Sequence, residues 1–359
     1  MAKINKTFQH YGKDQGMERF IVTPKTSKLR RMPEFIANHI FNLRSKILSL
    51  KIKVALNYSN ITLRNWISTD IMLLSRMGYK VNITAEAISF DLLERTRSTF
   101  VNGSINRAYA IIGLFSASSR YGYQLVNERN KVCTNRFVIL KNETIELYDG
   151  IKFLTESINP YVITETFFLG IHDSFEPKGK TVLDIGAGFG DTPLYYAKRG
   201  ARVIAVEPVN FLWLEKNIAL NTGLSGSITT LRIAAGRDGE IEMYVNENLS
   251  FDGNAMSNRK EGKKIKVQSK SIKKIIRDLG LTNIDFLKSD CKGCESEFDV
   301  DDFKLIKERV EIECVQDPRK IIDVLQKADF KVLMHHYDPT NKQPFTRGGT
   351  IVGEKLSNH

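Results

Sequence analysis

The segment Thr181-Val-Leu-Asp-Ile-Gly-Ala-Gly-Phe-Gly-Asp-Thr constrains the fold more than any other part of the chain. It predicts a short buried strand over 181–185, a tight glycine turn, and a helix over 192–199 that ends at Gly200. Glycine is needed where the backbone turns sharply and a ligand lies directly against it. Beyond this segment, strand and helix patterns alternate almost to the end of the chain, which predicts a parallel sheet with helices on both faces.

The next predicted strand, 202–206, ends at Glu207, about 20 residues beyond the glycine turn, where a carboxylate can bind the ribose hydroxyls of an adenosine ligand. The dinucleotide fingerprint GxGxxG requires glycine at position 191, where this chain has Asp191. Carboxylates at a helix N-terminus repel a pyrophosphate, whereas Asp184, just ahead of the glycines, attracts the ammonium group of a methionine moiety. The pattern therefore favours S-adenosylmethionine over NAD.

The residues predicted to bind this cofactor belong to the glycine turn, to the end of the second strand and to the corner after a third strand, predicted over 229–235. They are Asp184, Gly186, Ala187, Gly188, Gly190, Glu207, Pro208 and Ala235. A fourth strand, predicted over 283–288, leads into a loop of charged residues and cysteines. Because ligands bind beyond the carboxyl ends of the strands in such sheets, this loop is expected to line the substrate mouth, with a structural ion network as the alternative.

Cys291 and Cys294 form a CxxC motif within that loop, in a chain with four cysteines. A zinc ribbon needs a second pair, and a thioredoxin-like redox motif normally opens a helix. We therefore interpret the two cysteines as ordinary small residues of a site loop. A divalent metal on Asp290 is a further possibility, but no second ligand is visible nearby, and no metal site is predicted.

Four segments together resemble the FkbM family of methyltransferases: Leu183-Asp-Ile-Gly-Ala-Gly-Phe-Gly, Ala205-Val-Glu-Pro, Asn217-Ile-Ala-Leu-Asn, and Ile284-Asp-Phe-Leu-Lys-Ser-Asp-Cys-Lys-Gly-Cys-Glu. The resemblance spans about residues 135–355. The last segment matches the family signature Lys-x-Asp-x-Glu-Gly-x-Glu at Lys288, Asp290, Gly293 and Glu295. It departs at Lys292, where the family usually has glutamate.

This resemblance implies a Rossmann-like, seven-stranded class I methyltransferase sheet whose last strand, near Thr350, is antiparallel. It also implies methyl transfer to oxygen, often to a hydroxyl of a sugar, a glycan or a related metabolite. Asp290 and Glu295 are then the candidate bases for the hydroxyl proton, and Lys288 could orient either one. The exchange at Lys292 reverses a charge beside the expected acceptor and suits an anionic small molecule or glycan.

The front of the chain is basic, since residues 1–150 contain 23 Lys or Arg against 11 Asp or Glu, whereas the remaining residues contain 30 of each. Apolar spacing predicts helices from Pro33 to about Leu50 and over 62–78, 84–99 and 104–121, followed by a hairpin within 136–148. We therefore expect a basic, mainly helical N-terminal region over 1–130 and a methyltransferase domain over 131–359. The positive charge indicates an anionic partner for the front region.

Two other functions compete with sugar methylation. A tRNA or rRNA methyltransferase would use the basic region to bind phosphates, but the loop after the fourth strand lacks the Asp/Asn-Pro-Pro-Tyr sequence typical of base methylation. A non-catalytic protein with a cofactor fold could dock on an anionic membrane, although the intact glycine turn and Glu207 argue against it. Without an apolar run of membrane-spanning length or a signal peptide, the chain is expected to be cytoplasmic, with peripheral contact at the inner membrane surface as a further option.

Overall fold

The computed structural model describes residues 61–356 apart from 77–79, 84–86, 93–95, 102–104, 122–123, 128–136, 141–142, 174, 226, 246–252, 255–262, 316 and 336–348. The chain divides into two compact units, Met1–Leu169 and Gly170–His359. The predicted domain boundary after residue 130 stays a prediction. The arm up to residue 60, with the helix expected after Pro33, lies outside the described residues. No helix among the described residues is long and apolar enough to cross a bilayer.

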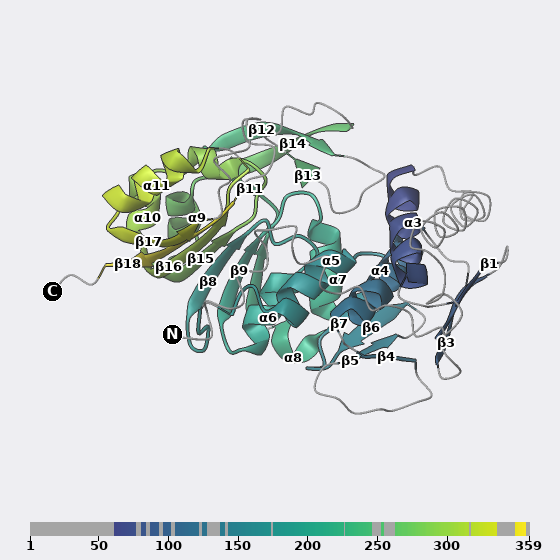
Figure 1. Cartoon of the computed structure of the whole chain (residues 1–359). Helices are drawn as coiled ribbons and strands as arrows, with labels where there is room; N and C mark the ends of the chain where they lie inside the picture. The colour runs from purple at the N-terminus through teal and green to yellow at the C-terminus, as the bar shows by residue number, and fades with distance from the viewer. Residues whose placement is uncertain are drawn as a thin grey trace, which may run out of the picture. The chain divides into compact units, whose positions relative to one another are not determined.

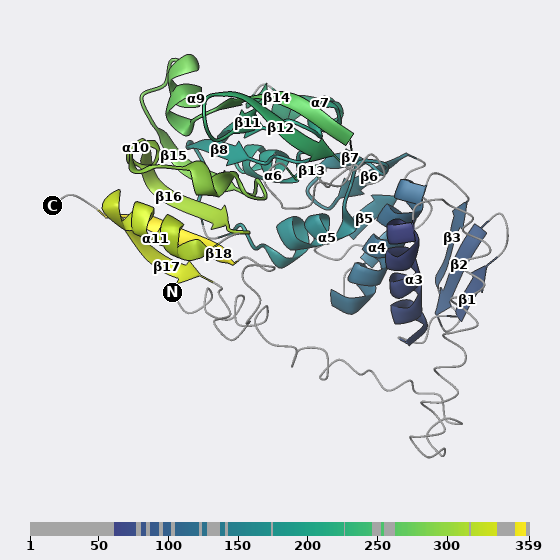
Figure 2. The ribbon, with the colours of Figure 1, turned by 90° about the horizontal axis from the view of Figure 1, so that it is seen from above.

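Two helices of the first unit, α3 (Ile61–Arg76) and α4 (Ile105–Tyr121), lie side by side, as Figure 2 shows. The buried residues of α3 recur at spacings of three and four along one face: Ile67, Ile71 and Leu74. That spacing is typical of an amphipathic helix packed on a neighbour. Both helices agree with the sequence prediction.

A three-stranded antiparallel sheet in the first unit overturns the helix predicted over 84–99. Its strands are β1 (Lys80–Ile83), β2 (Ala87–Leu92) and β3 (Thr96–Val101). The sequence of β2, Ala-Ile-Ser-Phe-Asp-Leu, alternates apolar and polar residues with a period of two, and β3 contains two β-branched threonines. A period of two and β-branched residues favour a strand, so the prediction of a helix was wrong.

A second sheet of the first unit contains the predicted hairpin. Its order is β4 (Gln124–Asn127), β5 (Phe137–Leu140), β6 (Thr144–Leu147) and β7 (Lys152–Leu154), and β5 and β6 are antiparallel as expected. The chain then forms α5 (Pro160–Ile163) and a π-helix, η3 (Thr164–Leu169). The side chain of Asn159 caps α5, and Tyr161 on α5 donates from its hydroxyl to the buried carboxylate of Asp70 on α3.

The second unit is built on a seven-stranded sheet, and Figure 1 shows its strands in a single twisted layer. The order is β10 (Ile228–Leu231), β9 (Arg202–Val206), β8 (Thr181–Ile185), β15 (Ile284–Ser289), β16 (Ile306–Glu313), β18 (Thr350–Lys355) and β17 (Phe330–His335). Neighbouring strands from β10 to β16 pair in parallel, whereas β18 is antiparallel to both of its neighbours. This is the Rossmann-like class I methyltransferase topology, and it confirms the predicted fold.

Helices cover both faces of this sheet. On one face lie α9 (Ile272–Asp278), α10 (Val300–Lys304) and α11 (Pro318–Lys327), which Figure 1 shows together beside β15 to β18. Their apolar side chains form one continuous core with alternate residues of the central strands. On the other face α6 (Asp191–Lys198) packs against β8 and β9, followed in the chain by α7 (Phe211–Ala219) and α8 (Thr222–Ser225).

The predicted third strand, 229–235, is divided between two sheets. Its first part is β10 at the edge of the main sheet, and its last two residues form β11 (Ala234–Ala235). β11 pairs with β14 (Lys263–Lys270) in a smaller sheet that also contains β12 (Gly239–Val245) and β13 (Gly253–Asn254). The pattern of apolar residues alone could not reveal this division, because it depends on pairing with residues 35 positions further along the chain.

Candidate active site

The glycine turn lies between the carboxyl end of β8 and the start of α6. Gly186, Gly188 and Gly190 have φ values of 78°, 55° and 100°, which side chains with a Cβ rarely tolerate. A Cβ on Gly186 would lie 2.2 Å from the carbonyl oxygen of Asp290, so the loop after β15 packs directly on this turn. Within the second unit, the turn and the loop therefore meet at the carboxyl edge of the sheet, where the sequence predicted both.

Glu207 connects the glycine turn to the loop after β9. Its Oε2 accepts a hydrogen bond from the N–H of Gly188 at 2.9 Å, and its Oε1 accepts from Val209 and Asn210 at 2.7 and 2.8 Å. The side chain is 5% exposed. Burial raises the pKa of the Glu207 carboxyl above its ordinary value, although the three backbone donors lower it in part. An ionised carboxylate offers about four acceptor sites, so the three backbone donors leave one for a ligand hydroxyl.

The other predicted cofactor residues surround these two features. Ala187 belongs to the turn and is fully buried, Pro208 follows Glu207 and is partly exposed, and Ala235 is buried at the end of β11. Asn217 on α7 donates from its side chain to the carbonyl of Phe189 in the turn, at 2.8 Å. This contact gives Asn217 a structural role in holding the turn. The ligand contacts of all these residues stay predictions.

A row of buried charges crosses three neighbouring strands just below the site. In register, Asp184 on β8 lies beside Lys288 on β15, which lies beside Glu311 on β16. The Lys288 ammonium is 3.2 Å from Asp184 Oδ1, and Thr192 donates its hydroxyl to Asp184 Oδ2. Burial lowers the pKa of Lys288, but Asp184 and the other nearby carboxylates raise it by more, so the net shift is upward. Lys288 thus stabilises Asp184, and its predicted role of orienting Asp290 or Glu295 stays a prediction.

His172 extends this row on the same face of the sheet. Its Nδ1 lies 2.6 Å from Glu311 Oε1, and both side chains are 8% exposed. Burial lowers the pKa of His172, but the neighbouring Glu311 carboxylate raises it by more, so the net pKa is above the ordinary 6.5. His172 is not marked by any motif in the sequence. Glu311 is recognisable in the sequence only as a charged residue among the apolar residues of 310–314.

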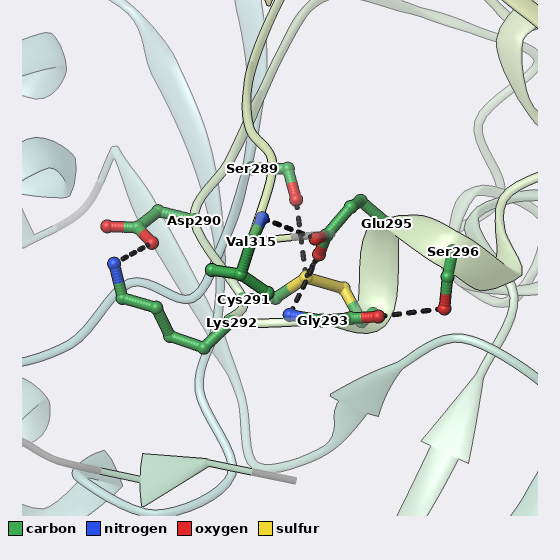
Figure 3. Close-up of a disulfide and its surroundings, with 9 residues drawn as sticks. Ser289, Asp290, Cys291, Lys292, Gly293, Glu295, Ser296 and Val315 are labelled. Atoms are coloured by element: carbon green, nitrogen blue, oxygen red, sulfur yellow. Dashed lines mark hydrogen bonds and ion pairs between the residues drawn. A yellow bond between two sulfur atoms is a disulfide. The ribbon is translucent and has the colours of Figure 1, made fainter. Parts of the chain in front are cut away.

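The loop after β15 is closed by a disulfide between Cys291 and Cys294, shown in Figure 3. The interpretation of these cysteines as two ordinary residues was therefore wrong. The turn at Lys292, with φ 57°, and Gly293, with φ 131°, brings the two Cα atoms within 5.5 Å, which is within reach of a disulfide. The sequence spacing alone could not show this, because it depends on that left-handed turn. The third described cysteine, Cys314, is free and buried.

Lys292 points away from the disulfide and joins two carboxylates. Its Nζ lies 2.6 Å from Asp290 Oδ1, as Figure 3 shows, and 3.0 Å from Oε2 of Glu313, the last residue of β16. All three side chains are between 32% and 41% exposed. Glu313 could not be recognised from the sequence, because its proximity to Lys292 depends on the pairing of β15 with β16.

Glu295 holds the far end of the same loop. Its Oε2 accepts from the N–H of Gly293 at 2.8 Å and its Oε1 accepts from the N–H of Val315 at 2.9 Å, beyond β16. Figure 3 shows the carboxylate between these two donors, close to the disulfide. The side chain is 1% exposed. Glu295 therefore ties the disulfide loop to the end of β16. Within the described part of the chain, no group of three His, Cys, Asp or Glu side chains could hold a metal ion.

Several solved structures are similar to part of this chain, at low identity and with low TM-scores. Magnesium protoporphyrin IX methyltransferase from Synechocystis PCC 6803 has 9% identity and a TM-score of 0.33, covering 55% of this chain and 79% of its own. Ribosomal protein L11 methylase from Lactobacillus delbrueckii subsp. bulgaricus has 14% identity and a TM-score of 0.34, covering 65% and 94%. The Methanococcus jannaschii fibrillarin pre-rRNA processing protein has 11% identity and a TM-score of 0.33, covering 77% and 97%. No curated protein sequence matches the chain.

The sequence model of the family described as "Methyltransferase FkbM domain" matches residues 184–332. This range begins in β8, just before the glycine turn, and includes Glu207 and the whole loop after β15. It ends in β17. Of the seven strands of the main sheet, the range includes β9, β10, β15 and β16 entirely and β8 and β17 in part. The similarity to the FkbM methyltransferase domain therefore lies entirely within the second unit of this chain.

Proposed function

We propose that this chain is an S-adenosylmethionine-dependent methyltransferase that methylates a hydroxyl oxygen of a sugar, a glycan or a related metabolite. The observation that carries the proposal is the pairing of the glycine turn with Glu207 at the carboxyl ends of β8 and β9. A backbone without side chains lets a ligand approach closely, and the fixed carboxylate can accept a hydrogen bond from a ribose hydroxyl.

The charges around the turn favour this donor over a dinucleotide. Asp191 is the first residue of α6, where a pyrophosphate would otherwise be stabilised by free backbone N–H groups. A carboxylate in that position opposes a phosphate and tolerates a cationic methionine moiety. Asp184 is paired with Lys288 and Thr192, so its own attraction for an ammonium group is partly offset.

S-adenosylmethionine supplies a methyl group that is already activated on a sulfonium. The residues of the chain must then align the acceptor, exclude water and remove one proton from the acceptor hydroxyl. Packing of the β15 loop on Gly186 places Asp290 and Lys292 close to the glycine turn. Those residues and Glu313 are therefore the side chains that we expect to meet the acceptor.

The charges of this mouth support an acceptor without an anionic group. Lys292, which the sequence suggested for binding an anion, already has Asp290 and Glu313 as partners within 3.0 Å. One ammonium and two carboxylates carry no excess positive charge for a phosphate or carboxylate to bind. The two carboxylates do not repel a neutral sugar hydroxyl.

Calorimetric titration with S-adenosylmethionine, S-adenosylhomocysteine and NAD tests the donor site. We expect the first two to bind and NAD not to bind. Glu207→Gln should weaken the binding of S-adenosylmethionine by tenfold or more, about 1.4 kcal/mol. Glu215→Gln, on the exposed face of α7, should leave this affinity unchanged. Binding of NAD alone, or equal binding by the Glu207 variant, would refute the proposed site.

Tritium transfer from labelled S-adenosylmethionine tests the acceptor class. The probes are a panel of neutral methyl glycosides, the same sugars as phosphates, and unmodified tRNA transcripts. Labelling of a neutral glycoside with release of S-adenosylhomocysteine supports the proposal. Labelling confined to tRNA would favour an RNA methyltransferase instead, and labelling confined to sugar phosphates would contradict the uncharged acceptor.

A further inference from the structure

This inference rests on the proposed function and concerns the disulfide ring formed by residues 291–294 in the loop after β15. Cys291 and Cys294 occupy two of the three positions that the signature Lys-x-Asp-x-Glu-Gly-x-Glu leaves open. The ring is therefore a feature of this chain in addition to the residues that the signature requires. Its contacts with the glycine turn determine what it can do.

The backbone at the start of the ring lies against the glycine turn. The N–H of Asp290 donates to the carbonyl of Ile185, the last residue of β8, at 2.9 Å. A Cβ built on Gly186 would lie 2.2 Å from the carbonyl oxygen of Asp290 and 3.2 Å from the nitrogen of Cys291. The first cysteine thus belongs to the backbone that covers Gly186. A shift of the ring moves that cover.

One carboxylate connects the ring to the rest of the loop. Glu295 Oε2 accepts from the N–H of Gly293 inside the ring at 2.8 Å, and the same oxygen lies 3.5 Å from Cys291 Sγ. Figure 3 shows this carboxylate beside the disulfide. The sulfur of a disulfide has no proton to donate, whereas a thiol in the same place can donate one to Glu295. Reduction therefore adds a competitor for the oxygen that holds Gly293.

The turn inside the ring depends on the covalent bond. Lys292 has a φ of 57°, a left-handed conformation that a residue with a Cβ rarely adopts. The disulfide holds this turn, because it keeps the Cα atoms of the two cysteines 5.5 Å apart. Without that bond, Lys292 can return to the right-handed or extended conformations that such residues prefer. The backbone over Gly186 then loses its fixed position.

The two sulfur atoms differ in their access to solvent. Cys291 is partly exposed, whereas Cys294 is 5% exposed and packs in the apolar core of the second unit. Thiol–disulfide exchange begins with the attack of a thiolate on an accessible sulfur. Attack on Cys291 is therefore favoured, with Cys294 as the leaving group.

We propose that Cys291 and Cys294 form a reversible redox site, and that a dithiol weakens the binding of S-adenosylmethionine by opening it. One thiolate of the dithiol attacks Cys291 Sγ, and the sulfur–sulfur bond breaks to release Cys294 as a thiolate, which takes up a proton. The second thiolate of the dithiol displaces Cys291 from the mixed disulfide, and Cys291 also takes up a proton. Two electrons and two protons pass to the protein, and the dithiol becomes a cyclic disulfide.

The first test measures the redox state of the two cysteines without S-adenosylmethionine. The full-length folded protein is equilibrated with oxidised or reduced dithiothreitol, quenched with acid, alkylated and digested with trypsin. Cleavage after Lys288, Lys292 and Lys304 leaves peptides 289–292 and 293–304 joined only by the disulfide. We expect the joined pair in the oxidised buffer and two alkylated cysteines in the reduced one. Free thiols in the oxidised buffer, or a disulfide that opens only after denaturation, would overturn the proposal.

The second test is calorimetric titration of the same protein with S-adenosylmethionine in the two buffers. Reduction should raise the Kd by about fivefold or more, because a loop that is no longer held must be ordered on binding. Reoxidation should restore the Kd. The double variant Cys291→Ser with Cys294→Ser should show the weaker affinity in both buffers. Cys314→Ala removes the free buried thiol and keeps the ring, so it should respond to reduction as the wild-type protein does.

The outcomes separate this inference from the proposed function. If the protein binds no S-adenosylmethionine in either buffer, the proposed function fails and control of its donor site fails with it, while the joined peptides still report the redox site. If the protein binds the donor with the same Kd in both buffers, the proposed function stands and only the redox control fails. If Cys314→Ala no longer responds to reduction, the response does not come from the ring, and the proposal is overturned.

Discussion

At the scale of single residues, the site depends on how buried charges are paired. Asp184 and Lys288 are 0% and 8% exposed in their side chains, and they lie on adjacent strands beneath the glycine turn. Removing one member of such a pair leaves the other charge buried without compensation, which is more costly than losing the attraction between them. The pair therefore specifies the local arrangement of β8 and β15.

We expect Lys288→Met to lower the free energy of unfolding by about 3–5 kcal/mol, because it leaves the Asp184 carboxylate uncompensated. The change is measured by urea denaturation. The double variant Asp184→Asn with Lys288→Met should be less destabilised than the sum of the single variants. Lys327→Met, which removes an exposed ion pair with Asp323, serves as a control with an expected loss of about 0.5 kcal/mol. A loss for Lys288→Met no larger than this control would contradict the assignment.

Single residues of the site were easier to predict from the sequence than the residues that they contact. Asp290, Glu295 and Lys288 were placed at the carboxyl ends of the strands from one motif, and all three lie there. Their contacts were not predictable, since each depends on a neighbour in another strand: Asp184 for Lys288, Val315 for Glu295, and Glu313 through Lys292 for Asp290. Their roles in catalysis stay predictions.

At the scale of elements, the disulfide loop after β15 is the part of the site held most tightly. The cysteines close a ring of four residues, and Glu295 joins that ring to the end of β16. For so short a ring, the chain-entropy model gives a stabilisation of about 2 kcal/mol. The ring also keeps Lys292 in a left-handed conformation that a residue with a Cβ rarely adopts.

We expect Cys291→Ser with Cys294→Ser to loosen this loop while the sheet stays intact. The measurement is hydrogen exchange, in which the amides of residues 291–295 should exchange faster and those of β8 and β9 should not change. Cys314→Ala, which removes the free buried thiol, is the control for general damage. Unchanged exchange across the loop would mean that the Glu295 contacts alone hold it.

The elements predicted correctly are those with a strong local pattern. The strand, glycine turn and helix from 181 to 198 agree with the sequence to within one residue, and the last antiparallel strand begins at Thr350 as expected. The helix predicted over 84–99 failed because a short amphipathic strand can also fit a helical spacing. The small sheet of β11 to β14 was missed, since β11 has only two residues and its partner lies far along the chain.

At the scale of the whole molecule, the row from Asp184 to His172 links stability to pH. The folded pKa of His172 is raised above its ordinary 6.5, since Glu311 outweighs the effect of burial. The folded state thus binds a proton more tightly than the unfolded chain. The stabilisation is fully present below pH 6.5 and is lost as the pH rises through the folded pKa.

We therefore expect the wild-type protein to have a higher free energy of unfolding than His172→Gln. This difference should be largest at pH 6 and below. The difference should shrink as the pH rises above 6.5, because the wild-type protein then loses the charge on His172. Denaturant unfolding at several pH values measures this difference. A difference that is constant or grows with pH would show that His172 is neutral in the folded protein.

The disulfide ring in the β15 loop also makes the geometry of the site depend on redox conditions. A disulfide forms when two thiols give up two electrons, so the shape that holds Lys292 exists only where an oxidant has acted on Cys291 and Cys294. In reducing surroundings we expect this ring to be open, which would allow Lys292 to leave Glu313. The redox conditions around the protein thereby determine which conformation of the β15 loop an acceptor meets.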